Sequence, residues 1–454
     1  MPEAAATRLL SDGDALREWL VQQRWFASKA RSVSELRVLE QVTLQQQPPF
    51  FALAIVEAVF QPGTHEIYQL PLGVRETGWE GGAIAEVDGW TIYDGLTDPD
   101  IARCLYRLMR ERYEAGELAF RSVDDELEAP QDVRPVGAEQ SNSSVVFDDK
   151  LILKLFRRLE AGVNPELELL RFLCSHGFEH VPPLVGWFEW GGRLMDATLG
   201  IMQRYLAGAR DGWELALDEL GRSPETFLNP LRELGAVTGR LHSVLGSDAS
   251  DPAFAPEEPS AESLSLLTAT VDEEIERVFV GLPEDERVEP VRGRGQDVRE
   301  RLQALSQIAV GGRVIRTHGD YHLGQTMRGA DSWTIIDFEG EPARPLPERR
   351  VKRSPLRDVA GMLRSFAYLA SASELMRGVS VPEGWEERAR VAFLDGYYEA
   401  VDGSLLPPGR EATDHLLSVF ELEKAVYELR YEINNRPDWV QIPVAGILRL
   451  LEET

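Results

Sequence analysis

The sequence predicts an α+β protein with two lobes, and three observations lead to this prediction. Alternating or β-branched apolar runs, typical of strands, concentrate in the first 203 residues. Helical apolar spacing characterises much of residues 204–454. Two polar segments, at 314–325 and 335–341, each begin with β-branched residues, so their side chains are expected at strand ends. We therefore expect a β-rich N-terminal cap at 1–90, a first lobe at 91–203 and a mostly helical second lobe at 204–454.

The composition narrows the class of protein. A chain of 454 residues can bury several cores, and 48 basic against 76 acidic residues give a net charge of −28. This excess of negative charge argues against nucleic acid or an anionic membrane as a partner. Two distant cysteines, no apolar run near twenty residues and no basic leader predict a cytoplasmic protein with reduced thiols.

The first ninety residues contain the signals of a small sheet. An amphipathic helix is expected over 12–24, followed by strands at 36–44, 50–60 and 65–72 and a strand pair within 83–94. A helix over 98–115 leads onward.

The first lobe continues with short strands around one helix. Strands are expected at 134–136, 144–147 and 151–156, and again at 185–190 and 199–203. Between them a helix opens at Asn164-Pro165, because asparagine caps helices and proline suits the first turn. In the second lobe helices are expected over 231–245 and 262–280.

The two polar segments contain the ligands that phosphoryl transfer requires. Asp320, in His318-Gly319-Asp320, is placed to meet an acceptor hydroxyl. Gln325 and Asp337 offer an amide and a carboxylate oxygen to magnesium held against a triphosphate. Their order parallels the catalytic loop and metal-binding segment of protein kinases, which predicts a two-lobed protein-kinase-like fold with ATP and Mg²⁺ as cofactors. A polar turn between core strands would explain the apolar residues but not the ligands.

A nucleotide site is expected in the first lobe. Lys154 lies inside an apolar strand, where its charge needs phosphate and a carboxylate as partners. Glu166 and Glu168 are both candidates for that carboxylate. Small polar residues before the strand offer backbone N–H groups and hydroxyls to phosphate, although a plain hairpin turn has the same composition. The expected phosphate-loop residues are Ser141, Asn142, Ser143 and Ser144, and Gln203 and Tyr205 are expected beside adenine at the hinge.

Residues 344–353 form the densest basic cluster in the chain, with four arginines and Lys352. It either attracts ATP and orders the lobe or forms a solvated loop. Asp358 is expected to accept hydrogen bonds from the backbone of the catalytic loop, and His242 is expected in the core.

A helix over 420–432 is the expected acceptor-binding element. Lys424, Tyr427 and Tyr431 share one face, with Trp439 nearby. Tyrosine and tryptophan stack on sugar rings while charged groups bind hydroxyls, so this face suits a carbohydrate. A salt-bridged surface helix is the alternative.

Several motifs together resemble the maltokinases, within the aminoglycoside and choline kinase superfamily. The resemblance covers nearly the whole chain. It includes an Arg-Trp-Phe opening at 24–26, in which Ser28 stands where glycine is expected. The other matching segments are 211–214, 318–325, 336–342, 357–361, 421–432 and 435–439.

The resemblance implies ATP-dependent phosphorylation of maltose at its anomeric hydroxyl, giving maltose 1-phosphate for α-glucan synthesis, with trehalose synthase as a partner. It implies that Asp320 orients the hydroxyl and His322 helps to place the sugar. It also favours Glu168 as the partner of Lys154 and adds Glu339 as a metal ligand. A kinase for another sugar, such as glucosamine, would keep the catalytic residues. A pseudokinase partner of trehalose synthase is disfavoured, because Lys154, Asp320, Gln325 and Asp337 are all present.

Overall fold

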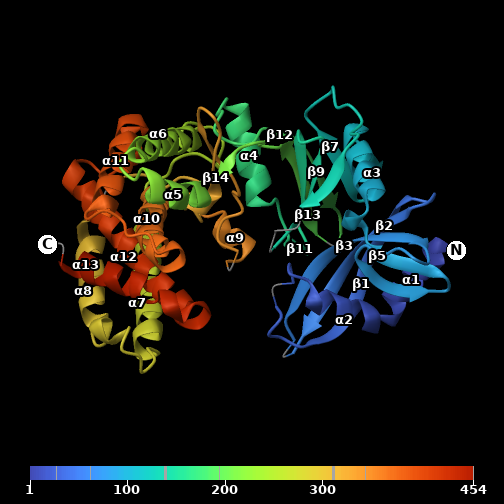
Figure 1. Cartoon of the computed structure of the whole chain (residues 1–454), viewed down its shortest axis with the longest axis horizontal. Coiled ribbons are helices and arrows are strands. Elements are labelled where there is room, and N and C mark those ends of the chain that lie inside the picture. The colour runs from blue at the N-terminus through green and yellow to red at the C-terminus, as the bar shows by residue number, and fades with distance from the viewer. Residues whose placement is uncertain are drawn as a thin grey trace. The chain divides into compact units, whose positions relative to one another are not determined.

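The structure is a computed structural model of the whole chain (Figure 1). It describes residues 1–452 except 27, 62, 137–140, 194, 309–311 and 343, and only the backbone of 12, 261–268, 270 and 304–308. The chain divides into two compact units, one made of 1–171 and 182–207, the other of 172–181 and 208–454. The α+β fold class predicted from the sequence is confirmed.

The first unit begins with two helices and a sheet, drawn in blue in Figure 1. All strand pairs in this sheet are antiparallel. Its order is β1-β2-β3-β5-β4, and the short β11 pairs with β3. The elements are α1 (Pro2–Asp12), α2 (Asp14–Gln22), β1 (Val33–Gln45), β2 (Phe50–Phe60), β3 (His65–Glu76), β4 (Ala83–Val87), β5 (Trp90–Asp94) and β11 (Arg158–Leu159).

The strand β2, which lies between β1 and β3, is buried on both faces. Phe51, Leu53 and Ile55 point to one face and pack into the core shared with the next sheet. Alternate residues, such as Phe50 and Val56, pack into the core shared with α1 and α2. Because side chains alternate along a strand, the nearly continuous apolar run 50–60 is what burial on both faces requires.

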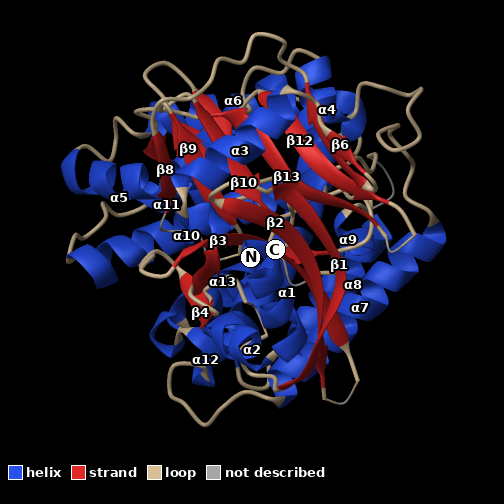
Figure 2. Cartoon of the chain, turned by 90° about the vertical axis from the view of Figure 1, so that its right-hand side faces the viewer, coloured by secondary structure: helices blue, strands red, loops and turns tan. Residues whose placement is uncertain are grey.

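A second antiparallel sheet of order β6-β7-β12-β13-β10-β9-β8 completes the first unit (Figure 2). The helix α3 packs on it, and Asp98 caps that helix by accepting the Asp100 N–H. The elements are η1 (Gly95–Thr97), α3 (Pro99–Arg110), β6 (Glu114–Ala115), β7 (Leu118–Ser122), β8 (Val133–Val136), β9 (Ser143–Phe147), β10 (Leu151–Leu155), α4 (Pro165–Ser175), β12 (Leu184–Gly191) and β13 (Asp196–Arg204).

Two expectations differ from this unit. The helix expected over 98–115 ends at Arg110, because Arg112 adopts a left-handed backbone (φ 50°) and a hairpin of β6 and β7 follows. The helix expected over 12–24 is α2, and Gly13, whose φ of 70° interrupts the helical path, separates it from α1, a helix that the sequence did not predict.

The second unit is mostly helical and runs from green to red in Figure 1. A small sheet of order β14-β15-β16 accompanies the helices. The elements are β14 (Arg210–Asp211), α5 (Gly212–Arg222), α6 (Leu228–Leu245), α7 (Ala261–Val280), η2 (Glu289–Val291), α8 (Gly295–Ile308), η3 (Leu323–Gln325), β15 (Thr326–Arg328), β16 (Trp333–Ile335), α9 (Leu346–Arg349), α10 (Leu356–Arg377), α11 (Trp385–Ala400), η4 (Gly403–Leu405), α12 (Arg410–Asn435), η5 (Pro437–Trp439) and α13 (Gln441–Glu452).

The long helix α12 contains neither glycine nor proline and packs against α7, α8, α10 and α13. Three buried glutamates on it accept from neighbouring side chains. Glu421 pairs with Arg390 at 2.5 Å, and Glu428 pairs with Arg364 at 2.7 Å. Glu432 accepts from Tyr368 at 3.0 Å. Across the described residues, no helix combines the length and apolarity that a membrane crossing requires.

Candidate active site

One buried carboxylate anchors the backbone of the expected catalytic loop, residues 318–325. Asp358, in the first turn of α10, accepts the His318 N–H at 2.8 Å and the Gly319 N–H at 3.0 Å. His242 Nε2 lies 3.2 Å from the same carboxylate, and His242 Nδ1 lies 3.1 Å from the Tyr397 hydroxyl. The expected support by Asp358 and the core position of His242 are therefore confirmed.

Asp358→Ala is expected to destabilise the second unit by about 3 kcal/mol, because it leaves buried N–H donors without an acceptor. Urea denaturation measures this loss. Asp358→Asn keeps one acceptor oxygen and should lose less, and equal midpoints for Asp358→Ala and wild type would contradict the anchoring role.

The catalytic loop is also tied to the segment that follows β16. His318 Nε2 donates to the Ile336 carbonyl at 2.9 Å, while His318 Nδ1 accepts from the Asp320 N–H at 3.4 Å. Gly319 and Gly340 have left-handed φ angles of 86° and 72°. A Cβ on Gly319 would lie 3.4 Å from the Gly340 Cα, which is an ordinary contact distance, so the left-handed backbone and not lack of space favours glycine there.

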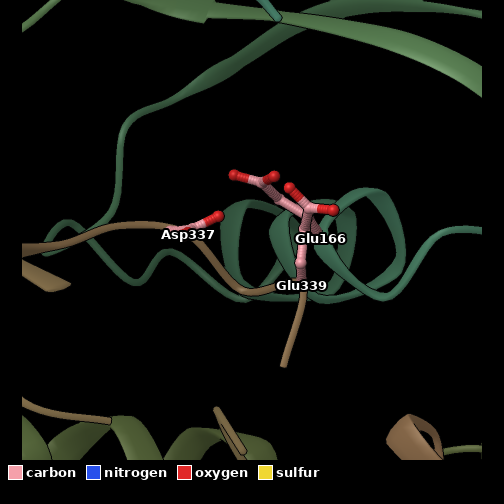
Figure 3. Close-up of side chains that lie close together, drawn as sticks. All are labelled: Glu166, Asp337 and Glu339. Atoms are coloured by element: carbon pink, nitrogen blue, oxygen red, sulfur yellow. The ribbon is translucent and has the colours of Figure 1, made fainter. Parts of the chain in front are cut away.

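The structure brings Gln325 and Asp337 together. Gln325 Nε2 donates to Asp337 Oδ2 at 3.1 Å, and the Ile336 N–H donates to the Gln325 carbonyl at 3.0 Å. Figure 3 shows Asp337 and Glu339 projecting from the same loop, two residues apart. Carboxylate and amide oxygens are the donors that Mg²⁺ prefers, so this set fits the expected ion. Asp337 has a φ of 64°, an uncommon backbone for a non-glycine residue and one often found at functional sites.

A pocket within the second unit opens beside Asp320. Its aromatic wall includes Phe420 and Tyr427 from α12. Acidic and basic side chains line it in equal number. The acidic residues are Asp320, Glu341, Glu348, Asp358 and Glu423, and the basic residues are Arg344, Arg349, Arg353, Arg357 and Lys424.

Lys424 and Tyr427 lie together in the lining of this pocket. Lys424 Nζ is 3.8 Å from Asp320 Oδ1 and 5.0 Å from the centre of the Tyr427 ring. Burial, together with the nearby Glu341 carboxylate, raises the pKa of Tyr427, so its hydroxyl stays protonated. Burial opposes ionisation of Glu341, yet the Arg344 guanidinium at 2.6 Å holds the pKa of Glu341 below its ordinary value.

The other two residues expected on this face lie elsewhere. Tyr431, one turn farther along α12, is exposed, and Arg436 lies over both its ring and that of Trp439. Trp439 also stacks on Tyr368 at 6.3 Å. Neither Tyr431 nor Trp439 is among the described residues that line the pocket at Asp320.

His322 begins the short helix η3 and is not a pocket-lining residue among those described. Its Nδ1 accepts the Gly324 N–H at 3.1 Å. Burial lowers the pKa of His322, although the Asp320 carboxylate acts in the opposite direction. By accepting this N–H, the His322 ring caps the start of η3.

In the first unit Lys154 pairs with Glu166. Lys154 Nζ lies 2.7 Å from Glu166 Oε2, and Figure 3 shows Glu166 on α4. Of the two candidate carboxylates, Glu166 thus bonds Lys154 directly. Asn164 caps this helix by accepting the Glu166 N–H at 2.8 Å, as the sequence predicts, and so fixes the first turn that contains Glu166.

The other residues expected at the nucleotide lie around the same strands. Asn142 and Ser144 are buried, Ser141 is exposed, and Asn142 Nδ2 donates to Ser141 Oγ at 3.2 Å. Glu139 and Gln140 of the expected loop lie outside the described residues. Gln203 is buried near the end of β13. The Tyr205 N–H donates to the Lys150 carbonyl at 2.8 Å.

The basic residues of the cluster at 344–353 make two different kinds of contact. Arg344, Arg349 and Arg353 line the pocket at Asp320, while Lys352 Nζ donates to the carbonyls of Pro252 and Ala255. Burial, helped by the neighbouring Arg357, lowers the pKa of Arg353 to about 10.

Three residues that line the pocket were not predicted from the sequence: Glu341, Glu423 and Phe420. Glu341 lies in the motif segment 336–342, and Phe420 and Glu423 lie in the helix expected over 420–432, so these two segments were the signals that could have identified them.

Comparison with known proteins gives the family. Residues 132–394, more than half of the chain, match the phosphotransferase enzyme family. The chain belongs to this family. Residues 19–98 of this phosphotransferase match the maltokinase N-terminal cap domain, and we call them the cap. The resemblance and the kinase-like fold expected from the sequence are confirmed.

Curated relatives and solved structures agree with this assignment. The glucosamine kinases of Streptacidiphilus jiangxiensis and Mycolicibacterium smegmatis are each 27% identical to the chain, over 334 and 336 residues. The matches cover 70% of this chain and 74% and 80% of those enzymes. A glucosamine kinase solved with glucosamine, ADP and inorganic phosphate is 20% identical with a TM-score of 0.72, covering 96% of this chain and 99% of that one. A second crystal form is 21% identical with a TM-score of 0.74, covering 98% and 99%.

Proposed function

We propose that this phosphotransferase transfers the γ-phosphoryl group of ATP to the anomeric hydroxyl of maltose. The observation that carries the proposal is the pocket at Asp320. There a carboxylate lies beside aromatic side chains, and the acidic and basic lining residues are equal in number. Sugars bind through ring stacking and hydroxyl hydrogen bonds, and this wall offers both. The match of residues 19–98 to the maltokinase cap domain supports maltose as the acceptor.

The proposed roles follow from the chemistry of each group. Asp320 orients the acceptor hydroxyl and takes its proton as the new O–P bond forms and ADP leaves with the electron pair of the broken P–O bond. Lys154, held by Glu166, binds the α- and β-phosphates of ATP. Gln325, Asp337 and Glu339 would hold magnesium, which neutralises charge on the phosphates when bound.

A neutral sugar is favoured over an amino sugar by Lys424. Its ammonium lies 3.8 Å from Asp320, so the ammonium of glucosamine would meet a like charge there. The equal number of acidic and basic wall residues also gives no excess of negative charge for a polycation such as an aminoglycoside.

Glucosamine is the second candidate acceptor, because both curated relatives described above are glucosamine kinases. An ADP-release assay with maltose, glucose, glucosamine, trehalose and an aminoglycoside separates the candidates. We expect the highest kcat/KM with maltose. A higher kcat/KM with glucosamine would make glucosamine, not maltose, the acceptor. No turnover with any sugar would favour the pseudokinase alternative. The partnership with trehalose synthase stays a prediction, which co-purification of the two proteins tests.

Tyr427→Ala is expected to raise the maltose KM about tenfold and to leave the ATP KM unchanged, because a stacking residue contributes mainly ground-state binding. Steady-state kinetics with each substrate varied in turn measures both constants.

Tyr431→Ala is the matched control, since it removes the same side chain one turn away, outside the pocket lining. We expect it to change neither constant. If Tyr427→Ala and Tyr431→Ala behaved alike, the pocket at Asp320 would not be the acceptor site.

A further inference from the structure

The Arg157 side chain joins three segments of the first unit. It is 1% exposed, and its Nη2 donates to Asp94 Oδ2 at 2.6 Å. Its Nε donates to Ser143 Oγ at 2.8 Å, and its guanidinium lies 4.8 Å from the centre of the Trp25 ring. Asp94 and Trp25 belong to the cap, whereas Ser143 begins β9. One buried cation therefore bonds the cap to the sheet that contains Lys154.

The backbone on either side of Arg157 is attached to the cap as well. The Gln69 N–H of β3 donates to the Arg157 carbonyl at 2.9 Å. Gln69 Nε2 donates to the Phe156 carbonyl at 2.6 Å and also bonds the Leu199 carbonyl of β13. Directly after Arg157, the strand β11 pairs with β3. Gln69 is fully buried, so these bonds are shielded from competing water.

These contacts lie next to the proposed nucleotide site. Lys154 is three residues before Arg157, and Leu155 pairs with Ser143 across β9 and β10. Ser143 directly follows Ser141 and Asn142 of the expected phosphate loop. A shift of Arg157 would thus move both the start of β9 and the end of β10.

We infer that Arg157 is a positioning residue through which the cap sets the geometry of the ATP-binding strands. The inference rests on the proposed function, because it takes Lys154 and Ser141–Ser144 as the nucleotide site. It gives the Arg-Trp-Phe opening of the cap a role, since Trp25 covers the Arg157 guanidinium. Asp94 completes the arrangement by supplying the opposite charge.

The central test measures nucleotide binding without any acceptor. Arg157→Met keeps much of the buried volume and removes both hydrogen bonds. We expect calorimetry with a non-hydrolysable ATP analogue to give a Kd about tenfold higher, in keeping with loss of a charge-assisted hydrogen bond. In steady-state assays the ATP KM should rise likewise, while the KM of the sugar acceptor stays unchanged.

Two further variants keep the test valid if Arg157→Met folds poorly. Asp94→Asn retains the shape and an acceptor oxygen, and Arg157→Lys retains the charge. Each should weaken analogue binding less than Arg157→Met, since each preserves part of the arrangement.

Arg75→Met is the matched control for general damage to the cap. Arg75 also pairs with a buried aspartate, Asp98, at 2.8 Å, but the side-chain bonds of Arg75 in the described part of the chain go to Asp98 and Asp100, not to β9 or β10. We expect unchanged analogue binding. Equal losses in Arg75→Met and Arg157→Met would reduce Arg157 to a purely structural role and overturn the inference.

Lys154→Met separates failure of the inference from failure of the proposed function. If Lys154→Met binds the analogue normally, the proposed nucleotide site is wrong. If Lys154→Met loses binding while Arg157→Met and Asp94→Asn bind as wild type does, only the inference is wrong.

Hydrogen exchange of the wild-type protein adds a test that needs no variant. Analogue binding is expected to slow amide exchange around Gln69 and Asp94 in the cap as well as in β10. Protection confined to β9 and β10 would mean that the cap does not respond to the nucleotide, and would overturn the inference.

Discussion

Asp320→Asn is expected to lower kcat by about 10²–10⁴-fold, the usual loss when a positioned general base is removed. Asp320 lines the pocket that we propose for the acceptor, and its carboxylate lies beside Lys424, whereas Lys154 belongs to the first unit. The Kd of ATP should therefore stay near the wild-type value. Single-turnover kinetics and calorimetry measure the two quantities separately.

Asparagine has the same shape as aspartate, so this substitution tests the charge and the proton acceptor, not packing. An unchanged melting temperature is the control for folding. If Asp320→Asn retained more than about a tenth of the wild-type kcat, the assignment of Asp320 as the base would be wrong.

Asp337→Asn is expected to reduce kcat more than about a hundredfold and to remove the magnesium dependence of ATP affinity, because a bound cation supplies several kcal/mol of charge stabilisation. Asparagine is the better substitution here, since Asp337 has a φ of 64° and asparagine tolerates that backbone more readily than alanine does. Calorimetry with ATP across a magnesium titration measures the effect.

Glu339→Gln, two residues farther along the same loop, is the matched comparison. We expect a smaller loss of magnesium-dependent affinity, since the direct hydrogen bond to Gln325 belongs to Asp337. Magnesium dependence that survives in Asp337→Asn would reject this carboxylate as a ligand.

The sequence predicted most clearly the features that depend on local chemistry. The strand at 50–60 was predicted with the bounds that β2 has, because a nearly continuous run of β-branched and aromatic residues is typical of a strand buried on both faces. The support of the catalytic loop by Asp358 also followed from its motif. Lys424 and Tyr427 were correctly grouped, because residues three apart share a helix face.

The choices that depend on packing between elements could not be made from the sequence. Glu166 and Glu168 both lie in the first turn of α4, and only the three-dimensional structure shows Glu166 Oε2 at 2.7 Å from Lys154 Nζ. Similarly, Tyr431 has the helical spacing of a pocket residue, but the pocket wall on α12 runs from Phe420 to Tyr427 and ends one turn before it. The positions of Glu341 and Arg344 depend on the fold of the loop after Asp337. That loop has no helical or strand periodicity from which side-chain positions could be predicted.

The opposing faces of α12 have a consequence for changing the acceptor in the laboratory. Glu423, Lys424 and Tyr427 line the pocket, while the buried glutamates 421, 428 and 432 bond to neighbouring helices. Glu423 also bonds Arg357 of α10 at 2.7 Å, so it belongs with the interhelical contacts. Randomising Lys424 and Tyr427 alters the surface that a sugar meets and leaves the interhelical bonds in place. A selection for new acceptors can therefore search these positions widely without first adding compensating mutations, whereas a library that included the buried glutamates would mostly sample proteins that fail to fold.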